Sequence, residues 1–244
     1  MKEIVCVGSC RILEPLRSVG LNLNQKSIYG YTHNTKEHIQ LIKTVGIMPS
    51  WESYVYNMVG RKKDLFLKPL LISDDRIFVV EICSIRVLEY DGVFLQLNRF
   101  YEFCNQFADN KKKPISFQDQ DSIRSWLSNI KSLPFNYKKI KFYEQNQQEI
   151  IDDVNELISI LGSNVIFVSH FNVDNFGGSI PQRKIIIEAL KYLEFQTGIN
   201  FYDPTSDVLA KGFKSSCIDA GHYQDYFINV IGNSIKNKII GLCT

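Results

Sequence analysis

The chain has 244 residues, of which 45% are hydrophobic and 22% charged, the balance of a soluble globular protein that buries a sizeable core. The length favours one domain over residues 1–244, and a net charge of +2 gives no reason to expect a nucleic-acid partner. No stretch reaches the ~18 apolar residues of a membrane span, and the apolar start at residues 1–7 is too short for a signal peptide. We therefore expect a cytoplasmic protein.

The cysteine and histidine contents argue against disulfides and metal sites. The six cysteines form no CxxC pair, so reduced thiols are expected, with Cys6 and Cys83 in the core. The four histidines and the cysteines show no zinc-binding spacing, and no metal is expected. Two short basic runs, 61–63 and 111–113, are interpreted as solvated loops, with contact to an anionic group such as a phosphate as the alternative.

The first half of the chain opens with a strand. Residues 4–7 (IVCV) form a continuous apolar run, which is typical of a buried parallel strand. Residues 34–37 match a capping box, and apolar residues at helical spacing follow as far as Val45. Residues 76–84 (RIFVVEICS) are the clearest strand, because most of them favour β structure. We also expect a short helix at 51–59, a hairpin at 87–97, and helices at 98–107 and 119–133.

The second half alternates helices and strands. Residues 143–161 have the strongest helical period, and Gly162 ends that helix. Alternation of this kind predicts an α/β fold, in which helices cover both faces of a parallel sheet. Residues 84–164 are a candidate for an inserted helical subdomain or lid. The remaining predicted elements are strands at 164–169 and 199–202, and helices at 181–196, 207–211 and 223–238.

Polar side chains follow three of the predicted strands. Ligands of open α/β sheets bind at the carboxyl ends of the strands, so we expect these groups to form one site. A further pair of polar residues lies just before the last helix. In chain order the groups are Gly8, Ser9 and Cys10; Cys83 and Ser84; Ser169, His170 and Asn172; and Asp219 and His222.

These residue types supply what acyl transfer needs: a nucleophile, a base, a carboxylate that orients the base, and donors for the oxyanion. Cys10 is the candidate nucleophile, and Ser9 is the alternative. His222 is the candidate base, and Asp219 is close enough along the chain to reach its ring. The candidates for oxyanion or substrate contacts are Ser9, Arg11, His33, Ser84, His170 and Asn172.

Each candidate also has a simpler interpretation. Cys10 would then be a small buried hydrophobe, Ser9 a helix cap and Asn172 part of a turn. Arg11 would pair with a surface carboxylate such as Glu14. Outside the candidate set, His38 is expected on a helix surface.

The strand-end residues Gly8, Ser9 and Cys10, the mid-chain Asn172 and the late Asp219-x-x-His222 motif resemble the SGNH/GDSL hydrolases. In that superfamily the first block is Gly-Asp-Ser, with serine as nucleophile, and the last is Asp-x-x-His. The match places Cys10 at the nucleophile position. This Gly-x-Cys variant is similar to the GSCFA proteins and to the WcbI-like capsule polysaccharide biosynthesis proteins. The resemblance implies a three-layer, flavodoxin-like fold and acyl-ester or acyl-transfer chemistry.

Two departures from the superfamily pattern bear on activity: residues 81–84 lack the expected oxyanion glycine, and Ser-His-Phe-Asn at 169–172 replaces Gly-x-Asn-Asp. The resemblance implies an acyltransferase or an ester or thioester hydrolase acting on a sugar or polysaccharide precursor. No tightly bound cofactor is expected, but acetyl-CoA or another acyl-CoA is a candidate donor, with Arg11, Arg17 and the basic runs as candidate phosphate contacts. The departures leave a second class open, a non-catalytic module that binds a carbohydrate or nucleotide on the same scaffold.

Overall fold

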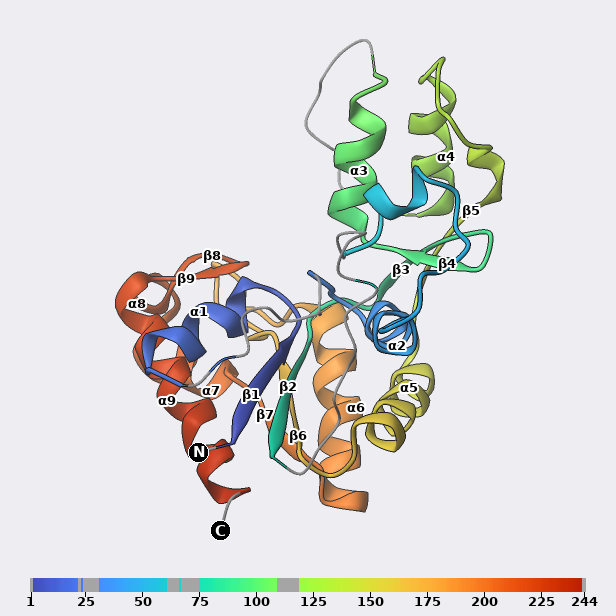
Figure 1. Ribbon diagram of the computed structural model, residues 1–244. Helices are drawn as coiled ribbons and strands as arrows, with labels where there is room; N and C mark the ends of the chain where they lie inside the picture. Colours follow the sequence, from blue (N-terminus) through green and yellow to red (C-terminus); the bar gives the residue numbers. More distant parts are fainter. Residues whose placement is uncertain are drawn as a thin grey trace.

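A four-stranded parallel sheet forms the centre of the molecule (Figure 1). The computed structural model describes residues 2–21, 23, 31–60, 66, 75–108 and 119–242. The two basic runs of the sequence, 61–63 and 111–113, lie outside the described residues. In spatial order the strands are β1 (Glu3–Val7), β2 (Arg76–Ile82), β6 (Val165–Ser169) and β7 (Asn200–Tyr202).

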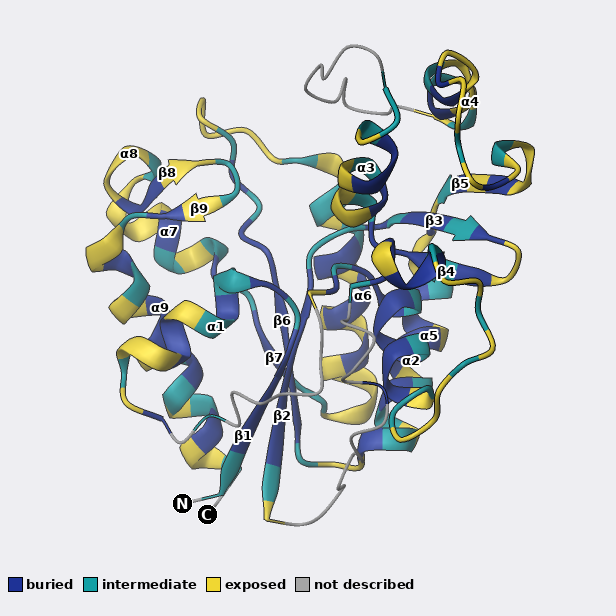
Figure 2. Ribbon diagram, turned by 45° about the horizontal axis from the view of Figure 1, so that its top comes forward, coloured by how far each residue is buried: buried dark blue, intermediate teal, exposed yellow. Residues whose placement is uncertain are grey.

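Helices cover both faces of this sheet, as the alternation predicted. Each face has its own apolar cluster, and the strands between them are almost entirely buried (Figure 2). One face packs against α2 (Thr35–Lys43), α5 (Gln147–Leu161) and α6 (Pro181–Thr197). The other packs against α1 (Cys10–Ser18), α7 (Thr205–Lys211), α8 (Phe213–Ser216) and α9 (Asp225–Gly241). The fold is therefore a three-layer α/β structure.

A second, smaller sheet stands beyond the carboxyl ends of the central strands (Figure 1). Its apolar residues form a third cluster, separate from the two beside the central sheet. Helix α5, in contrast, packs on the central sheet, so residues 84–164 contribute to both parts. The elements of the smaller part are β3 (Arg86–Tyr90), β4 (Val93–Leu95), β5 (Ile140–Glu144), α3 (Leu97–Asn105), α4 (Gln120–Ser128) and the 3₁₀ turns η1 (Val55–Asn57) and η3 (Tyr137–Lys139).

Three predicted helices differ from the structure, and the one expected at 119–133 is α4, which ends at Ser128. The helix expected from residue 143 begins at Gln147, because Ile140–Glu144 pair with β3 as a strand. A capping box at Asn146 fixes the true start. The helix expected at 51–59 is one 3₁₀ turn at Val55–Asn57. The error at 143–146 comes from pairing with a strand distant in the chain, which local periodicity does not record.

Gly232 lies where α9 crosses α1. A Cβ at this position would overlap the Pro15 carbonyl oxygen and lie 2.8 Å from Val19 Cγ1. We expect Gly232→Ala to lower the free energy of unfolding by about 2–3 kcal/mol, because the Pro15 backbone cannot easily yield. Gly241→Ala in the same helix is the control, because a Cβ there meets nothing within 4 Å and should change stability by less than ~1 kcal/mol. Equal urea midpoints for the two variants would contradict this packing.

No helix within the described residues is long and apolar enough to cross a membrane.

Candidate functional site

The first strand leads into its helix through a turn that requires glycine. Gly8 has a φ of +148°, a conformation that L side chains rarely adopt. A Cβ at Gly8 would also lie 2.7 Å from Glu81 Cβ. Ser9 caps α1, because its side chain accepts a hydrogen bond from the Arg11 backbone N–H. Cys10 is thereby the first residue of the helix, at the carboxyl edge of the sheet.

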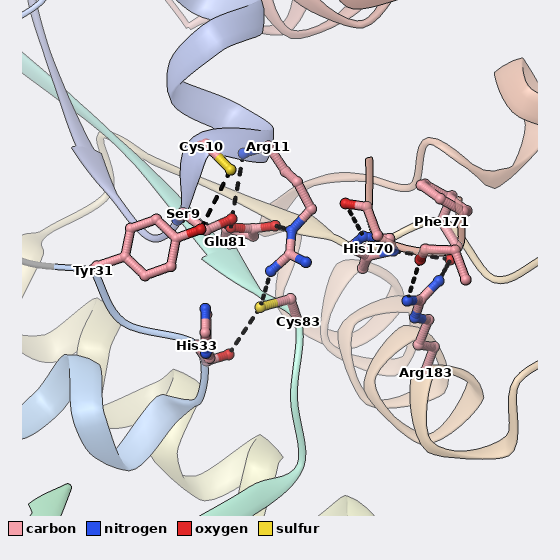
Figure 3. Close-up of polar contacts among 12 residues, drawn as sticks. Ser9, Cys10, Arg11, Tyr31, His33, Glu81, Cys83, His170, Phe171 and Arg183 are labelled. Atoms are coloured by element: carbon pink, nitrogen blue, oxygen red, sulfur yellow. Dashed lines mark hydrogen bonds and ion pairs between the residues drawn. The ribbon is translucent and has the colours of Figure 1, made fainter. Parts of the chain in front are cut away.

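A buried carboxylate at the end of β2 organises this turn (Figure 3). Glu81 accepts hydrogen bonds from the Ser9 N–H at 2.8 Å and the Ser9 hydroxyl at 2.5 Å, and pairs with Arg11 Nε at 2.9 Å. Burial alone would raise the pKa of this carboxyl, but the Arg11 charge and the Ser9 hydrogen bonds lower it to about 2. The Ser9 hydroxyl therefore serves the turn. The sequence analysis missed Glu81, whose signal was an acidic residue inside an apolar strand.

Cys10 is half-buried and differs from the core thiols in its surroundings. Its Sγ lies 3.3 Å from the Tyr31 hydroxyl. Burial and the hydrogen bond with Cys10 raise the pKa of Tyr31 to about 12, so the phenol stays protonated and can donate to a thiolate. Tyr31 has no sequence signal, because a bridge to Gly8 brings it here.

Arg11 contacts the interior of the site instead of a surface carboxylate. Besides Glu81, its guanidinium donates from Nη2 to Cys83 Sγ at 2.9 Å. Cys83 is consequently not a core residue as expected; it is half-buried and faces Arg11 (Figure 3). Burial raises the pKa of the Cys83 thiol, so Cys83 is a weaker candidate nucleophile than Cys10.

The end of β2 is tied to the chain segment that carries His33. The N–H groups of Cys83 and Ser84 both donate to the His33 carbonyl oxygen, at 3.0 and 3.1 Å. Ser84 Oγ accepts a hydrogen bond from the Arg86 N–H. Both backbone donors at this strand end are therefore already occupied. This is the strand end at which the resemblance to the superfamily led us to expect an oxyanion glycine.

His38 is fully buried, so the expectation that it lies on a helix surface is wrong. Its Nε2 donates to the Glu81 carbonyl oxygen at 2.6 Å, and its Nδ1 lies 2.8 Å from the Thr32 hydroxyl. Burial lowers the pKa of His38 to about 4, so the ring is neutral and holds β2 against α2.

Asp219 and His222 form a pair on the hairpin of β8 (Cys217–Asp219) and β9 (His222–Tyr223). His222 Nδ1 lies 3.0 Å from Asp219 Oδ1, and the two side chains are 58% and 56% exposed. This contact fits the predicted base and orienting carboxylate. No hydrogen bond joins His222 to Cys10 among the described residues.

Two partly or fully buried side chains hold the loop of this hairpin near the sheet edge. Arg183 donates to the carbonyl oxygens of Phe171 and Ala220, at 2.8 and 2.5 Å. His170 Nε2 lies 3.5 Å from the Gly221 carbonyl oxygen. Burial, followed by the charges of Arg11 and Arg183, lowers the pKa of His170 well below its usual value. His170 is therefore neutral and supports the loop; Arg183 had not been singled out from the sequence.

Asn172 organises the turn between β6 and α6. Its Oδ1 accepts from the Ile180 N–H at 2.6 Å, and its Nδ2 donates to Ser179 Oγ at 2.8 Å. These contacts match the simpler interpretation of Asn172 as a turn residue. Its role as an oxyanion donor stays a prediction, with one amide hydrogen already committed.

Within the described residues, no group of three or more His, Cys, Asp or Glu side chains could hold a metal ion. The side chains described at this edge include a thiol, an Asp–His pair and two arginines.

Known proteins share the fold and much of the sequence length of this chain. A solved GDSL-family lipolytic protein from Veillonella parvula DSM 2008 matches with a TM-score of 0.50 over 96% of each chain, at 9% identity; this shows a shared fold. The Vi polysaccharide biosynthesis protein TviD of Salmonella typhi is 24% identical over 266 residues, which cover 98% of this chain but 32% of that protein. The chain thus spans about a third of that relative's length. The TviD N-terminal domain model matches residues 2–238, and the chain belongs to the TviD N-terminal domain family.

Proposed function

We propose that this chain is a carbohydrate-related enzyme that transfers an acyl group through Cys10. The thiolate would attack the carbonyl carbon of an ester or thioester, forming a new C–S bond. The C–O or C–S bond to the leaving group would then break, and the leaving group would take a proton from His222. Asp219 would orient the His222 ring. An acceptor hydroxyl would finally displace Cys10, giving up its proton to His222.

One observation carries this proposal: the position of Cys10. The thiol stands at the N-terminal end of α1, 3.3 Å from a Tyr31 hydroxyl that remains protonated. The preformed Asp219–His222 pair lies on a loop anchored by Arg183 and His170. A cysteine in ordinary core packing would have neither neighbourhood.

The substrate class follows from the relative, whose name refers to polysaccharide biosynthesis. We propose a sugar or polysaccharide precursor as the acceptor, and acetyl-CoA or another acyl-CoA as the donor. The Gly-x-Cys likeness to GSCFA and WcbI-like proteins supports the same chemistry. Hydrolysis of an acyl group would use the same acyl-enzyme, with water in place of the acceptor alcohol.

A second candidate function is a non-catalytic module that binds a saccharide or nucleotide. It is favoured by the occupied N–H groups of Cys83 and Ser84, because these backbone donors cannot also stabilise an oxyanion.

Site-resolved alkylation tests the enzymatic proposal. Native protein is treated with iodoacetamide from pH 5 to 9, and modification of each cysteine is followed by mass spectrometry. We expect Cys10 to be alkylated much faster than the buried thiols across this range. His222→Ala should slow that reaction, because the proposed base for the thiol is lost.

The buried Cys6 and Cys104 are internal controls, and burial raises the pKa of Cys6 to about 12. If Cys10 is as inert as these two thiols, or keeps the same pH profile in His222→Ala, the thiol–imidazole couple does not exist. The binding module then becomes the better explanation.

A further inference from the structure

Gln96 fixes the position of one proton on the His33 ring. The Gln96 side chain is fully buried at the start of α3. Its Oε1 accepts a hydrogen bond from the Arg99 backbone N–H at 2.6 Å. A backbone N–H can only donate, so the amide orientation is not interchangeable. The Gln96 amide nitrogen must therefore face His33 Nδ1, which lies 3.2 Å away.

The tautomer of His33 follows from this contact. An amide NH₂ group has no acceptor, so Nδ1 must accept from it and cannot carry a proton itself. Burial, followed by the Arg11 charge, lowers the pKa of His33 to about 4. The ring is therefore neutral at pH 7, with its single proton on Nε2.

The Nε2 side of the ring is not used by the fold. Among the described residues, no hydrogen-bond partner is found for His33 Nε2, and the atom is not sealed in the interior. The ring packs edge-on against Tyr31, with 5.2 Å between centroids. Figure 3 shows His33 close to Tyr31 and Cys83. Tyr31 therefore contacts both groups: its ring packs against His33, and its hydroxyl lies 3.3 Å from Cys10 Sγ.

Other donors at this edge are largely committed elsewhere. The N–H groups of Cys83 and Ser84 donate to the carbonyl oxygen of His33 itself. The Asn172 amide donates to Ser179. The segment that carries His33 therefore occupies the backbone donors of Cys83 and Ser84, and it brings the His33 ring as a side-chain donor in their place.

We propose that His33 Nε2–H is the oxyanion donor for the acyl group attacked by Cys10, and that Gln96 is its positioning residue. The role rests on the proposed function. The negative charge that develops on the carbonyl oxygen would accept the Nε2–H bond while the C–S bond forms. A neutral imidazole keeps its proton in this role and is not consumed by the reaction.

The proton position is tested without activity, by ¹⁵N-detected NMR of the histidine rings at pH 7. We expect the His33 signals of the wild type to show a protonated Nε2 and an unprotonated Nδ1. Gln96→Glu places an acceptor opposite Nδ1 and keeps an oxygen for the Arg99 N–H, so Nδ1 should become protonated. Gln106→Glu, an exposed position after the same helix, is the charge-matched control and should leave the spectrum unchanged. A wild-type ring protonated on Nδ1 overturns the inference.

The catalytic role is tested with p-nitrophenyl acetate. His33→Phe keeps the ring shape but has no N–H donor, so it should lower the rate of Cys10 acylation on the order of 10²-fold, while iodoacetamide alkylation, which develops no oxyanion, should change less than about 2-fold. Equal losses in both reactions, or no loss in acylation, overturn the donor role. If the wild type shows the Nε2 proton yet Cys10 is never acylated, the proposed function and the donor role fail, while the proton assignment stands.

Discussion

Replacing Glu81 by glutamine should cost about 3–5 kcal/mol of folding stability at pH 7. The carboxylate is buried and is the described ion-pair partner of Arg11, and it binds both the N–H and the hydroxyl of Ser9. Glutamine retains the shape but removes the charge, so Arg11 loses its partner in a poorly solvated site. The measurement is urea unfolding followed by far-UV circular dichroism.

The pH dependence of stability gives this prediction a second signature. The folded pKa of Glu81 is about 2, against an ordinary value of 4.5, so its contribution is complete above pH 4.5. As the pH falls from 4.5 through 2, the unfolded chain binds the proton first, and about 3 kcal/mol is lost. The neutral His33 and His38 act in the same direction but between pH 6.5 and about 4. Glu81→Gln should therefore flatten the loss of stability below pH 4.5.

An exposed ion pair provides the control for Glu81. Glu102→Gln removes the partner of Arg99 on α3, where the side chains are 62% and 52% exposed. The change in unfolding free energy should stay within about 0.5 kcal/mol. Suppose instead that Glu81→Gln is as stable as Glu102→Gln and loses stability below pH 4.5 as the wild type does. The buried pair then does not support the turn at Cys10.

The parts of the fold that the sequence predicts are those set by local patterns. The apolar run at 4–7 and the clear strand at 76–84 predicted the central strands. The parallel sheet then implied that their polar ends meet. Strand β5 was not predicted, because it is recognisable only by its pairing with β3, about fifty residues earlier in the chain.

The candidate site shows the same division. Cys10, Asp219 and His222 stand out because reactive residue types follow strand-end or motif spacing. The groups that set their environment carry no such signal. Glu81 meets Ser9 across 72 residues, and Gln96 meets His33 across 63. The sequence thus indicates candidate reacting groups, whereas tertiary structure determines the protonation of the groups around them.

Removing the Cys10 thiol should abolish acyl transfer and leave the fold intact. Cys10→Ala is expected to lower turnover of p-nitrophenyl acetate by at least about 10³-fold, as for the loss of a covalent nucleophile. Stability should change by less than about 1 kcal/mol, because Cys10 is half-buried and its described side-chain partner is Tyr31. Circular dichroism and urea unfolding of the variant check the fold.

Mass spectrometry of the intact protein and of its peptides separates covalent catalysis from simple binding of a ligand. Wild-type protein quenched in acid during turnover should carry one acetyl group on the peptide that contains Cys10. In Cys10→Ala none of the other described thiols should acquire it, because burial raises the pKa values of Cys6, Cys83, Cys104 and Cys217 and suppresses their thiolates. If the variant keeps its turnover, or the acetyl group maps to another residue, Cys10 is not the nucleophile. The protonated Tyr31 beside Cys10, and the neutral His33 that packs against Tyr31, would then have to serve the binding of a ligand.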